Sequence, residues 1–406
     1  MKSTRKHAPS AARVASHRAA AGSSGLLSCV AMRSVFFLLL TLGSLAAVGQ
    51  TPRQAPSGDV DALMRAGIAA QRQGDNRTAI EKYRKVLAIR SEIVEARIGL
   101  GAALAAVGQL DEAIDEDKRA LAAAHDKNAV RMNLGMAYYK KGDAEKAREQ
   151  FEAVHAALPH DVPAAVQLGF VYVKLGREAE AVDLLTPLEP GHESNTDLEY
   201  VLAFSLIQSG KEKEGVPRME KVAQATHSAS AYVIAGADLL HRSDMSDART
   251  DLDAAMKVDP SIPGLATMAG QARYAMGDMA AATAAFQAAL RQNPRDFNAN
   301  LELGAIRLKE RDLDDARPLL ELALELQPTF PMARLEMAKL DETDGKYAEA
   351  EVILEDLVKA EPNWMDAHWE LATAYLELDR PEDGKRERII AQELKLRHQQ
   401  KASGPE

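Results

Sequence analysis

The amino-acid sequence predicts an all-α protein built as a stack of helical hairpins. Hydrophobic residues make up 46% of the 406 residues but aromatic residues only 5%, and much of the apolar content is Ala and Leu, which favour helices. No long run alternates between apolar and polar residues, as a half-buried strand would. The chain also exceeds the usual size of a single core. Several domains or a one-dimensional stack of repeats would suit this length, and the composition favours the stack.

The clearest single unit lies at residues 128–161. Leu134 and Tyr138 are four residues apart, so they share one face of a first predicted helix. Ala147 and Phe151 share one face of a second predicted helix in the same way. These spacings indicate two helices that pack against each other.

Two residues encode the turn between these helices. Gly142 can adopt the left-handed conformation that ends the first helix, and Asp143 can accept hydrogen bonds from the free amides that open the second. Pro159 closes the unit, because proline cannot continue a helix. The segment is therefore expected to form one helical hairpin.

The hairpin resembles a tetratricopeptide repeat, a family whose period is about 34 residues. The resemblance rests on Leu134-Gly135, Tyr138, Gly142, Ala147, Phe151 and Pro159. It implies a right-handed superhelical α-solenoid of helix-turn-helix repeats, in which the first helices line an inner, concave surface. Small residues at the eighth and twentieth positions would let the paired helices approach closely, and large residues would fill the remaining gap.

Residues 1–49 are predicted to be a targeting segment that is cleaved after Gly49. They contain no Asp or Glu but six basic residues: Lys2, Arg5, Lys6, Arg13, Arg18 and Arg33. They end in an apolar run that is too short to span a bilayer comfortably, and Ala47 and Gly49 are small residues where a signal peptidase reads. We therefore expect an exported protein, periplasmic or extracellular, with no membrane span in the mature chain.

Two other interpretations of this segment stay open. An organellar transit peptide would also be rich in Arg and Ser and free of acid, and an uncleaved anchor would keep the apolar run. Met32 alone could start an ordinary bacterial secretion signal, in which case residues 1–31 are not translated. All three interpretations place the targeting information before residue 50.

Charge and cysteine content exclude several kinds of site. Cys29 is the only cysteine, and it lies in the targeting segment, so the mature chain can form no disulfide and no thiolate metal site. Removal of the six basic residues takes the formal net charge from -10 to -16. Such an acidic chain is a poor partner for nucleic acid and for anionic membrane surfaces.

After a linker at residues 50–58, the repeats are predicted to run over residues 59–394, followed by a polar tail at 395–406. The first four repeats are marked in order by Gly67 and Tyr83, Gly101 and Ala120, Gly135 and Phe151, and Gly169 and Leu185. In the second repeat Asp117 occupies the position of a large aromatic residue. Pro187 and Pro190 are expected to end the second helix of the fourth repeat early, with a longer loop to about Asn195.

The fifth and sixth repeats are the least regular. Pro217 falls inside the second helix of the fifth and is expected to interrupt it, and the sixth aligns only if one residue is dropped. Repeats seven to nine are regular, with Gly270 and Phe286, Gly304 and Leu320, and Ala338 and Leu354. The second helix of the tenth opens at Pro381 and is rich in Arg and Lys, as expected of a solvent-facing cap.

No pattern typical of an enzyme or a cofactor site stands out. Gly99-Leu100-Gly101 lacks the third glycine and the preceding strand of a dinucleotide-binding loop. His155 and His160 lack the glutamate of a metalloprotease helix, and the other histidines are scattered along the repeats. Because the repeats take up nearly the whole chain after residue 49, we expect no enzymatic activity, no cofactor and no metal.

The inner positions of the first helices are unusually apolar in repeats three to six. The residues predicted to line a partner-binding groove are Met132, Met136, Tyr139, Val166, Phe170, Val173, Tyr200, Phe204, Ile207, Val233 and Ile234. Tighter packing between neighbouring first helices, or a groove filled by the chain itself, would produce the same pattern. In later repeats the same positions turn acidic, at Glu302, Glu336, Glu342, Asp366, Glu370 and Glu377, which a solvated face would also explain.

The sequence therefore predicts a non-enzymatic scaffold that binds a protein or peptide segment with apolar side chains, in a cell-envelope assembly. One alternative is an accessory subunit of an envelope enzyme or of a secretion or glycan-export machine. Another is a structural spacer without a ligand in the groove. The sequence predicts neither the partner nor the oligomeric state.

Export makes a direct prediction about the mature N-terminus. If the small residues Ala47 and Gly49 direct cleavage, the mature protein begins at or near Gln50 and is found outside the cytoplasm. N-terminal sequencing of the protein purified from its native host measures this. A mature N-terminus at Met1, or a pool confined to the cytosol, would contradict export.

Overall fold

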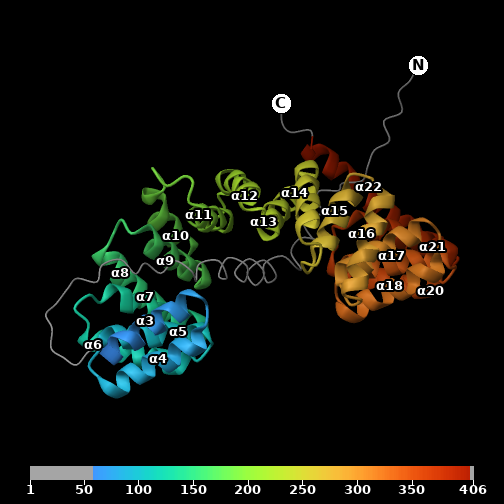
Figure 1. Cartoon of the computed structure of the whole chain (residues 1–406). Coiled ribbons are helices and arrows are strands. Elements are labelled where there is room, and N and C mark those ends of the chain that lie inside the picture. The colour runs from blue at the N-terminus through green and yellow to red at the C-terminus, as the bar shows by residue number, and fades with distance from the viewer. Residues whose placement is uncertain (1–57, 403–406) are drawn as a thin grey trace. The chain divides into compact units, whose positions relative to one another are not determined.

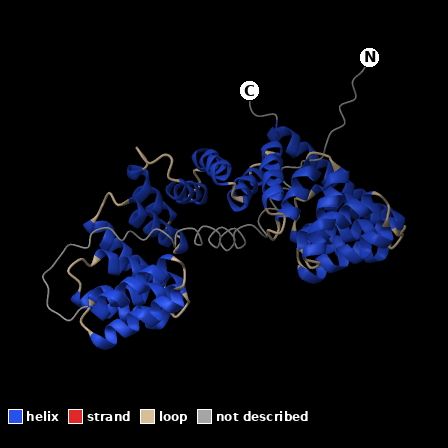
Figure 2. Ribbon diagram, in the orientation of Figure 1, coloured by secondary structure: helices blue, strands red, loops and turns tan. Residues whose placement is uncertain are grey.

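The computed structural model describes residues 58–402, and among these residues it contains helices and no strands (Figure 2). The targeting segment and nearly all of the linker lie outside the described residues. The helices follow one another as ten pairs, one for each predicted repeat, within this described part. The predicted all-α solenoid is confirmed.

The first five pairs are α3 (Gly58–Arg72) and α4 (Asn76–Ile89), α5 (Val94–Ala106) and α6 (Leu110–Ala123), α7 (Asn128–Lys141) and α8 (Ala144–Ala157), α9 (Val162–Lys174) and α10 (Glu178–Leu185), and α11 (Thr196–Gln208) and α12 (Glu212–Thr226). The next five are α13 (Ala229–His241) and α14 (Met245–Val258), α15 (Leu265–Ala275) and α16 (Met279–Gln292), α17 (Phe297–Lys309) and α18 (Leu313–Leu326), α19 (Pro331–Thr343) and α20 (Tyr347–Ala360), and α21 (Met365–Glu377) and α22 (Pro381–Ala402).

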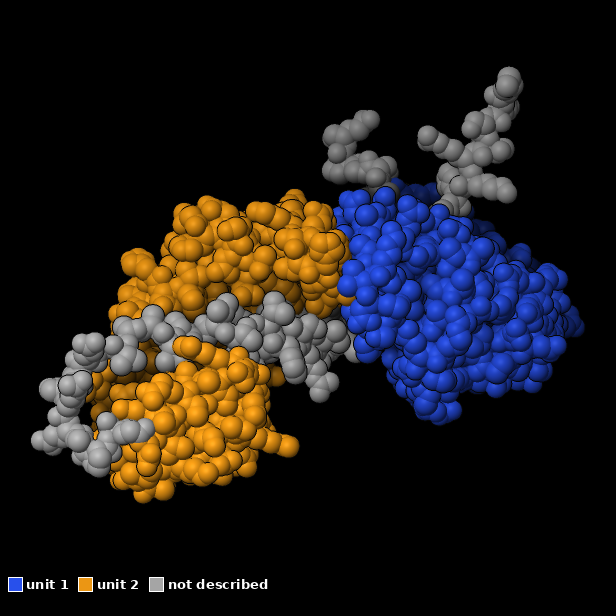
Figure 3. Space-filling model, viewed as in Figure 1, with its two compact units in different colours: residues 1–23, 239–406 blue, residues 24–238 orange. Residues whose placement is uncertain are grey.

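The described chain divides into two compact units, one up to Asp238 and one from Leu239 onward (Figure 3). Second helices pack against the first helix of the next pair, as α4 does with α5 and α20 does with α21 (Figure 1). First helices of successive pairs also contact each other, as α5 does with α7 and α19 does with α21. Such contacts between successive first helices are expected of the repeat architecture.

The hairpin turn of the third repeat forms as predicted. Gly142 ends α7 with φ of 89°, in the left-handed region, where a side chain would be strained. The carboxylate of Asp143 then accepts a hydrogen bond from the backbone amide of Lys146 at 3.3 Å, which caps the start of α8. The same Gly-Asp pair therefore ends one helix and begins the next.

Close approach of the two helices depends on a small residue of the first helix that faces a large residue of the second. A Cβ atom added at Gly135 would lie 2.6 Å from Cε1 of Phe151. The same relation holds between Gly270 and Phe286, also at 2.6 Å. Because Phe151 and Phe286 are almost fully buried, no room exists there for a larger residue than glycine.

Polar contacts join neighbouring repeats at a recurring position. The Tyr172 hydroxyl on α9 donates to Glu152 on α8 at 3.0 Å, and the Tyr375 hydroxyl on α21 donates to Glu355 on α20 at 2.8 Å. An arginine also lies over the face of each tyrosine ring. The Cζ atom of Arg177 is 5.0 Å from the ring centroid of Tyr172, and that of Arg380 is 4.3 Å from the ring centroid of Tyr375. These contacts tie a second helix to the first helix that follows it.

A second recurring contact joins the two helices of one hairpin. Arg97 on α5 donates to Glu116 on α6 at 2.6 Å. In the last pair, buried His368 on α21 lies 2.5 Å from Glu387 on α22, measured from Nδ1 to Oε2. Both first-helix residues also bond a backbone carbonyl of the loop that precedes their helix, so each contact holds the inter-repeat loop as well.

The two irregular repeats behave differently from each other. As predicted, α10 ends early at Leu185 and a short 3-10 helix, η2 (Thr186–Leu188), follows it. The expectation that Pro217 interrupts the fifth repeat is wrong, because α12 runs through it without a break. Proline removes one backbone hydrogen bond from the helix, but its fixed φ is compatible with helical backbone. The guanidinium of the next residue, Arg218, donates a hydrogen bond to the carboxylate of Glu199 on α11 at 3.1 Å.

The last described helix, α22, continues to Ala402, past the predicted boundary at residue 394. Arg388 follows Ala372 at the same spacing at which Leu354 follows Ala338 in the preceding repeat, so the two residues occupy equivalent positions. The Arg388 guanidinium is exposed and lies 5.8 Å from the ring centre of Trp369. A charged residue at this core position suits a hairpin with no following neighbour among the described residues.

Enlarging Gly135 should destabilise the third repeat. Gly135→Leu forces bulk against Phe151 and should lower the free energy of unfolding by about 1–3 kcal/mol, although better helix propensity returns up to about 1 kcal/mol. Urea melts of the mature chain measure the change. Glu149→Leu is the matched control, because it adds the same side chain at an exposed position of the same hairpin. Equal midpoints for the two variants would contradict the close packing at Gly135.

Candidate protein-binding site

Most of the residues predicted to line the apolar groove are buried in the unit that ends at Asp238. Seven are at most 8% exposed: Val166, Phe170, Tyr200, Phe204, Ile207, Val233 and Ile234. The other four, Met132, Met136, Tyr139 and Val173, are partly buried. The inner positions of these first helices therefore present little apolar surface to solvent.

Packing between neighbouring first helices accounts for part of this burial. The rings of Phe170 on α9 and Tyr200 on α11 lie 6.4 Å apart between centroids, and α9 and α11 are both first helices. On α7, Met132, Met136 and Tyr139 pack against the core of the first repeats. These contacts agree with the alternative explanation of the apolar pattern, in which the residues pack between neighbouring first helices.

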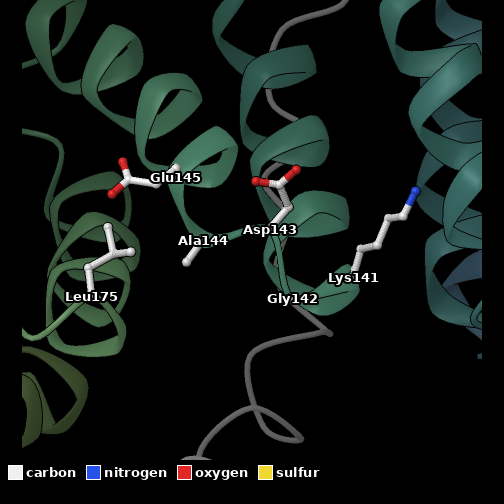
Figure 4. A pocket seen from close by; sticks show the side chains of 6 residues that line it. All are labelled: Lys141, Gly142, Asp143, Ala144, Glu145 and Leu175. Carbon is white, nitrogen blue, oxygen red and sulfur yellow. The ribbon is translucent and has the colours of Figure 1, made fainter.

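A shallow, open pocket of about 460 Å³ lies at the turn between α7 and α8 (Figure 4). It is lined by Lys141, Gly142, Asp143, Ala144, Glu145 and Leu175. None of the predicted groove residues lines it. Its walls are the hairpin turn and one residue after α9, so it offers no enclosed binding site.

The unit from Leu239 onward carries a cluster of charged side chains on two neighbouring first helices, α19 and α21. Lys339 on α19 donates to Glu336 at 3.1 Å, and the Glu336 side chain is only 13% exposed. Glu370 and Asp366 on α21 act electrostatically on the same lysine. We call these four residues, together with Glu342, the α19–α21 charged cluster.

Burial and mutual repulsion disfavour charge on two of these carboxyls. Burial is the main cause of the raised pKa of Glu342, and the charge of the neighbouring Glu370 raises that pKa further. Burial also raises the pKa of Glu370, against the opposing effect of Lys339. Burial alone would lower the pKa of Lys339, but Glu336, Glu370 and Asp366 together raise it. The lysine thus stays charged among carboxyls that compete for it.

The structure therefore gathers four of the six predicted acidic residues, Glu336, Glu342, Asp366 and Glu370, around one lysine. Of the other two, Glu302 is buried on α17 and Glu377 is exposed at the end of α21. Sequence reasoning missed Lys339. The signal was present, because residues three apart on a helix, as Lys339 is from both Glu336 and Glu342, share a face.

This arrangement can recognise positive charge. Four carboxyls face one lysine, so an added cationic group would find acceptors whose mutual repulsion it relieves. Within residues 58–402, no group of three or more His, Cys, Asp or Glu side chains is placed to hold a metal ion. In the same residues, no helix has both the length and the apolar character needed to cross a membrane.

Several solved structures are similar to this chain at low sequence identity. A tetratricopeptide repeat protein from Parabacteroides merdae is 15% identical over 66% of this chain and 99% of its own, with a TM-score of 0.47. Pseudomonas aeruginosa pilF is 19% identical over 54% of this chain and 96% of its own, with a TM-score of 0.45. Yeast Tom70 is 15% identical over 84% of this chain and 96% of its own, with a TM-score of 0.34. No curated protein matches the sequence.

Family models decide the assignment. Three models, each described as a tetratricopeptide repeat, match residues 53–253, 267–330 and 307–374. Together the matches span most of the chain, and they coincide with the paired helices. The chain belongs to the tetratricopeptide repeat family, whose fold serves as a scaffold for protein–protein interaction.

Proposed function

We propose that this protein is an exported scaffold that binds a segment of a partner protein on the inner faces of its first helices. The observation that carries the proposal is the α19–α21 charged cluster, in which partly buried carboxyls on two first helices compete for Lys339. Solvated surface charges would not repel each other in this way, because water would screen them.

A partner segment with Lys or Arg side chains fits this cluster best. A cationic group near Glu342 and Glu370 would offset the burial and repulsion that now raise both pKa values. Arginine could do this with two parallel hydrogen bonds to one carboxylate. The interaction should therefore be strongest at low salt.

A second contact region, for apolar side chains of the partner, is proposed on α7 and α9 in the other unit. It comprises the four groove residues that keep partial exposure, Met132, Met136, Tyr139 and Val173. Methionine and tyrosine provide large contact areas and adapt to the shape of a partner. The more deeply buried residues would support these four rather than touch the partner.

We place this activity in a cell-envelope assembly. The basic, acid-free residues 1–49 with Ala47 and Gly49 support export. A chain without cysteine after residue 49 is compatible with an oxidising compartment, because it has no thiol to protect. The partner would then be another envelope protein.

Neutralising the cluster should weaken partner binding without unfolding the array. We expect the double change Glu336→Gln with Glu370→Gln to weaken binding of the partner captured from the envelope by at least tenfold, about 1.4 kcal/mol. Affinity measured at two salt concentrations should fall with salt for the wild type and much less for the double variant. Glu349→Gln with Glu361→Gln removes the same charge from exposed positions and is the control. Equal affinity and equal salt dependence in all three proteins would favour a spacer without this site.

Burial distinguishes the two kinds of apolar residue. Phe170→Ser with Phe204→Ser should destabilise the array by at least about 3 kcal/mol, because both rings are buried. Met136→Ser, at a partly buried position, should leave the melting temperature nearly unchanged and weaken partner binding. Thermal melts and the same binding assay measure both effects. A stable Phe170/Phe204 variant that loses the partner would instead make the deeper residues the binding surface.

A further inference from the structure

The second repeat contains a buried carboxyl group that has no cation or hydrogen-bond donor beside it in the described part of the chain. Asp117 on α6 is 0% exposed. Neither of its carboxylate oxygens has a hydrogen-bond partner within residues 58–402. Buried carboxylates are normally paired with a cation or bonded by donors, so this aspartate is exceptional.

Its position in the repeat explains why it is buried. Asp117 follows Gly101 at the same spacing at which Phe151 follows Gly135, and a Cβ atom added at Gly101 would collide with the Asp117 carboxylate. The residues at equivalent positions of other hairpins, among them Phe151, Phe286 and Leu320, are almost fully buried. The carboxyl therefore stands where hairpins such as those of Phe151 and Phe286 have a bulky side chain between their helices, and it cannot turn outward while α5 and α6 stay packed.

Charged groups on α6 and on neighbouring helices form no hydrogen bond with Asp117. On α6 itself, Glu116 is engaged by Arg97 of α5 at 2.6 Å, and Glu112 by Arg84 of α4, also at 2.6 Å. On α7, Arg131 and Lys140 are partly buried, and Lys140 donates to the Ala105 carbonyl at 3.3 Å. None of the basic residues donates a hydrogen bond to Asp117.

The surroundings thus favour the neutral carboxyl. Burial is the main cause and the charge of Glu116 adds to it, and together they raise the pKa of Asp117 to about 8. At neutral pH the packed repeat therefore keeps a proton that an opened repeat would release to water.

We propose that Asp117 is a pH-dependent latch of the second repeat: its neutral carboxyl lets α6 pack between α5 and α7, and its ionisation opens α6 to water. The ionised carboxylate has no cation or donor inside the packed hairpin, so it is stabilised only when water reaches it. In a solenoid each hairpin contacts only its neighbours, so this opening can stay local.

The direction of the pH effect follows from linkage. The packed state binds the proton more tightly than the opened state, whose aspartate has its ordinary pKa of 3.8. The contribution of Asp117 to the stability of the packed repeat is therefore fully present below about pH 4, and this contribution is lost as pH rises toward 8. Above pH 8 both states are ionised and the dependence ends.

A consequence for binding rests on the proposed function. The opening helix α6 packs against α7, which carries Met132, Met136 and Tyr139. Loss of that support would loosen the proposed apolar contact region, so partner binding there would weaken as pH rises. The latch itself does not depend on any partner and is tested without one.

Hydrogen exchange of the full mature chain between pH 5 and 9, corrected for the intrinsic exchange rate, measures the opening of α6 directly. In the wild type the opening equilibrium constant of α6 should rise about tenfold per pH unit between about pH 5 and 7, as expected for one released proton. Asp117→Asn should make the profile flat. Asp115→Asn, an exposed carboxylate two residues away, should keep the wild-type profile.

Asp117→Leu provides a second variant in case the asparagine amide disturbs packing. Leucine fills the equivalent position at Leu320, so this variant should fold and should show slower exchange in α6 at pH 7 than the wild type. A wild-type profile that is flat, or that stays the same when Asp117 is replaced by Asn or Leu, would overturn the latch. Opening at pH 8 that spreads equally to α16 and α18 would also overturn it, because the change would then not be local.

Discussion

The structure depends on the close approach of two helices at one small residue. Gly135 against Phe151, and Gly270 against Phe286, bring the backbones of a hairpin together and fill the space between them with one large ring. A single hairpin buries too little surface to be stable alone, so each one needs its neighbours. Contacts such as that of Tyr172 with Glu152 then connect one hairpin to the next.

The close packing within each hairpin also determines which side chains of a first helix remain for other contacts. Signature positions of a first helix are committed to the hairpin, and some of its other positions contact neighbouring first helices. In the unit up to Asp238 these positions hold large apolar side chains such as Phe170 and Tyr200, which meet each other. In the unit from Leu239 they hold the charged side chains of Glu336, Lys339 and Glu370, which are partly exposed.

Local features were predictable from the sequence because they depend on neighbours in the chain. The turn at Gly142 and the early end of α10 before Pro187 follow from backbone geometry alone. Helical phase also placed Phe170 and Glu370 on inner positions, but phase gives a direction and not a distance. It could not show that Phe170 would be covered by the adjacent first helix.

Predictions from the sequence were wrong or incomplete where the outcome depends on contacts between different helices. Pro217 was expected to break a helix, yet α12 continues through it, with Arg218 bound to Glu199 beside it. That ion pair joins two different helices, and no local pattern reveals it. Asp117 was visible as a departure from the repeat pattern, but only the structure shows that its carboxylate is both buried and unpaired.

Site-specific photocrosslinking in cells of the native host tests the central claim most directly, namely that partners bind the first helices. A photoreactive residue would be placed at Glu336 or Met136, on first helices, and for comparison at the exposed positions Glu149 or Glu349, on second helices. The account predicts that a defined partner is captured from Glu336 and Met136 and not from the second-helix positions. Capture mainly from Glu149 or Glu349 would contradict it.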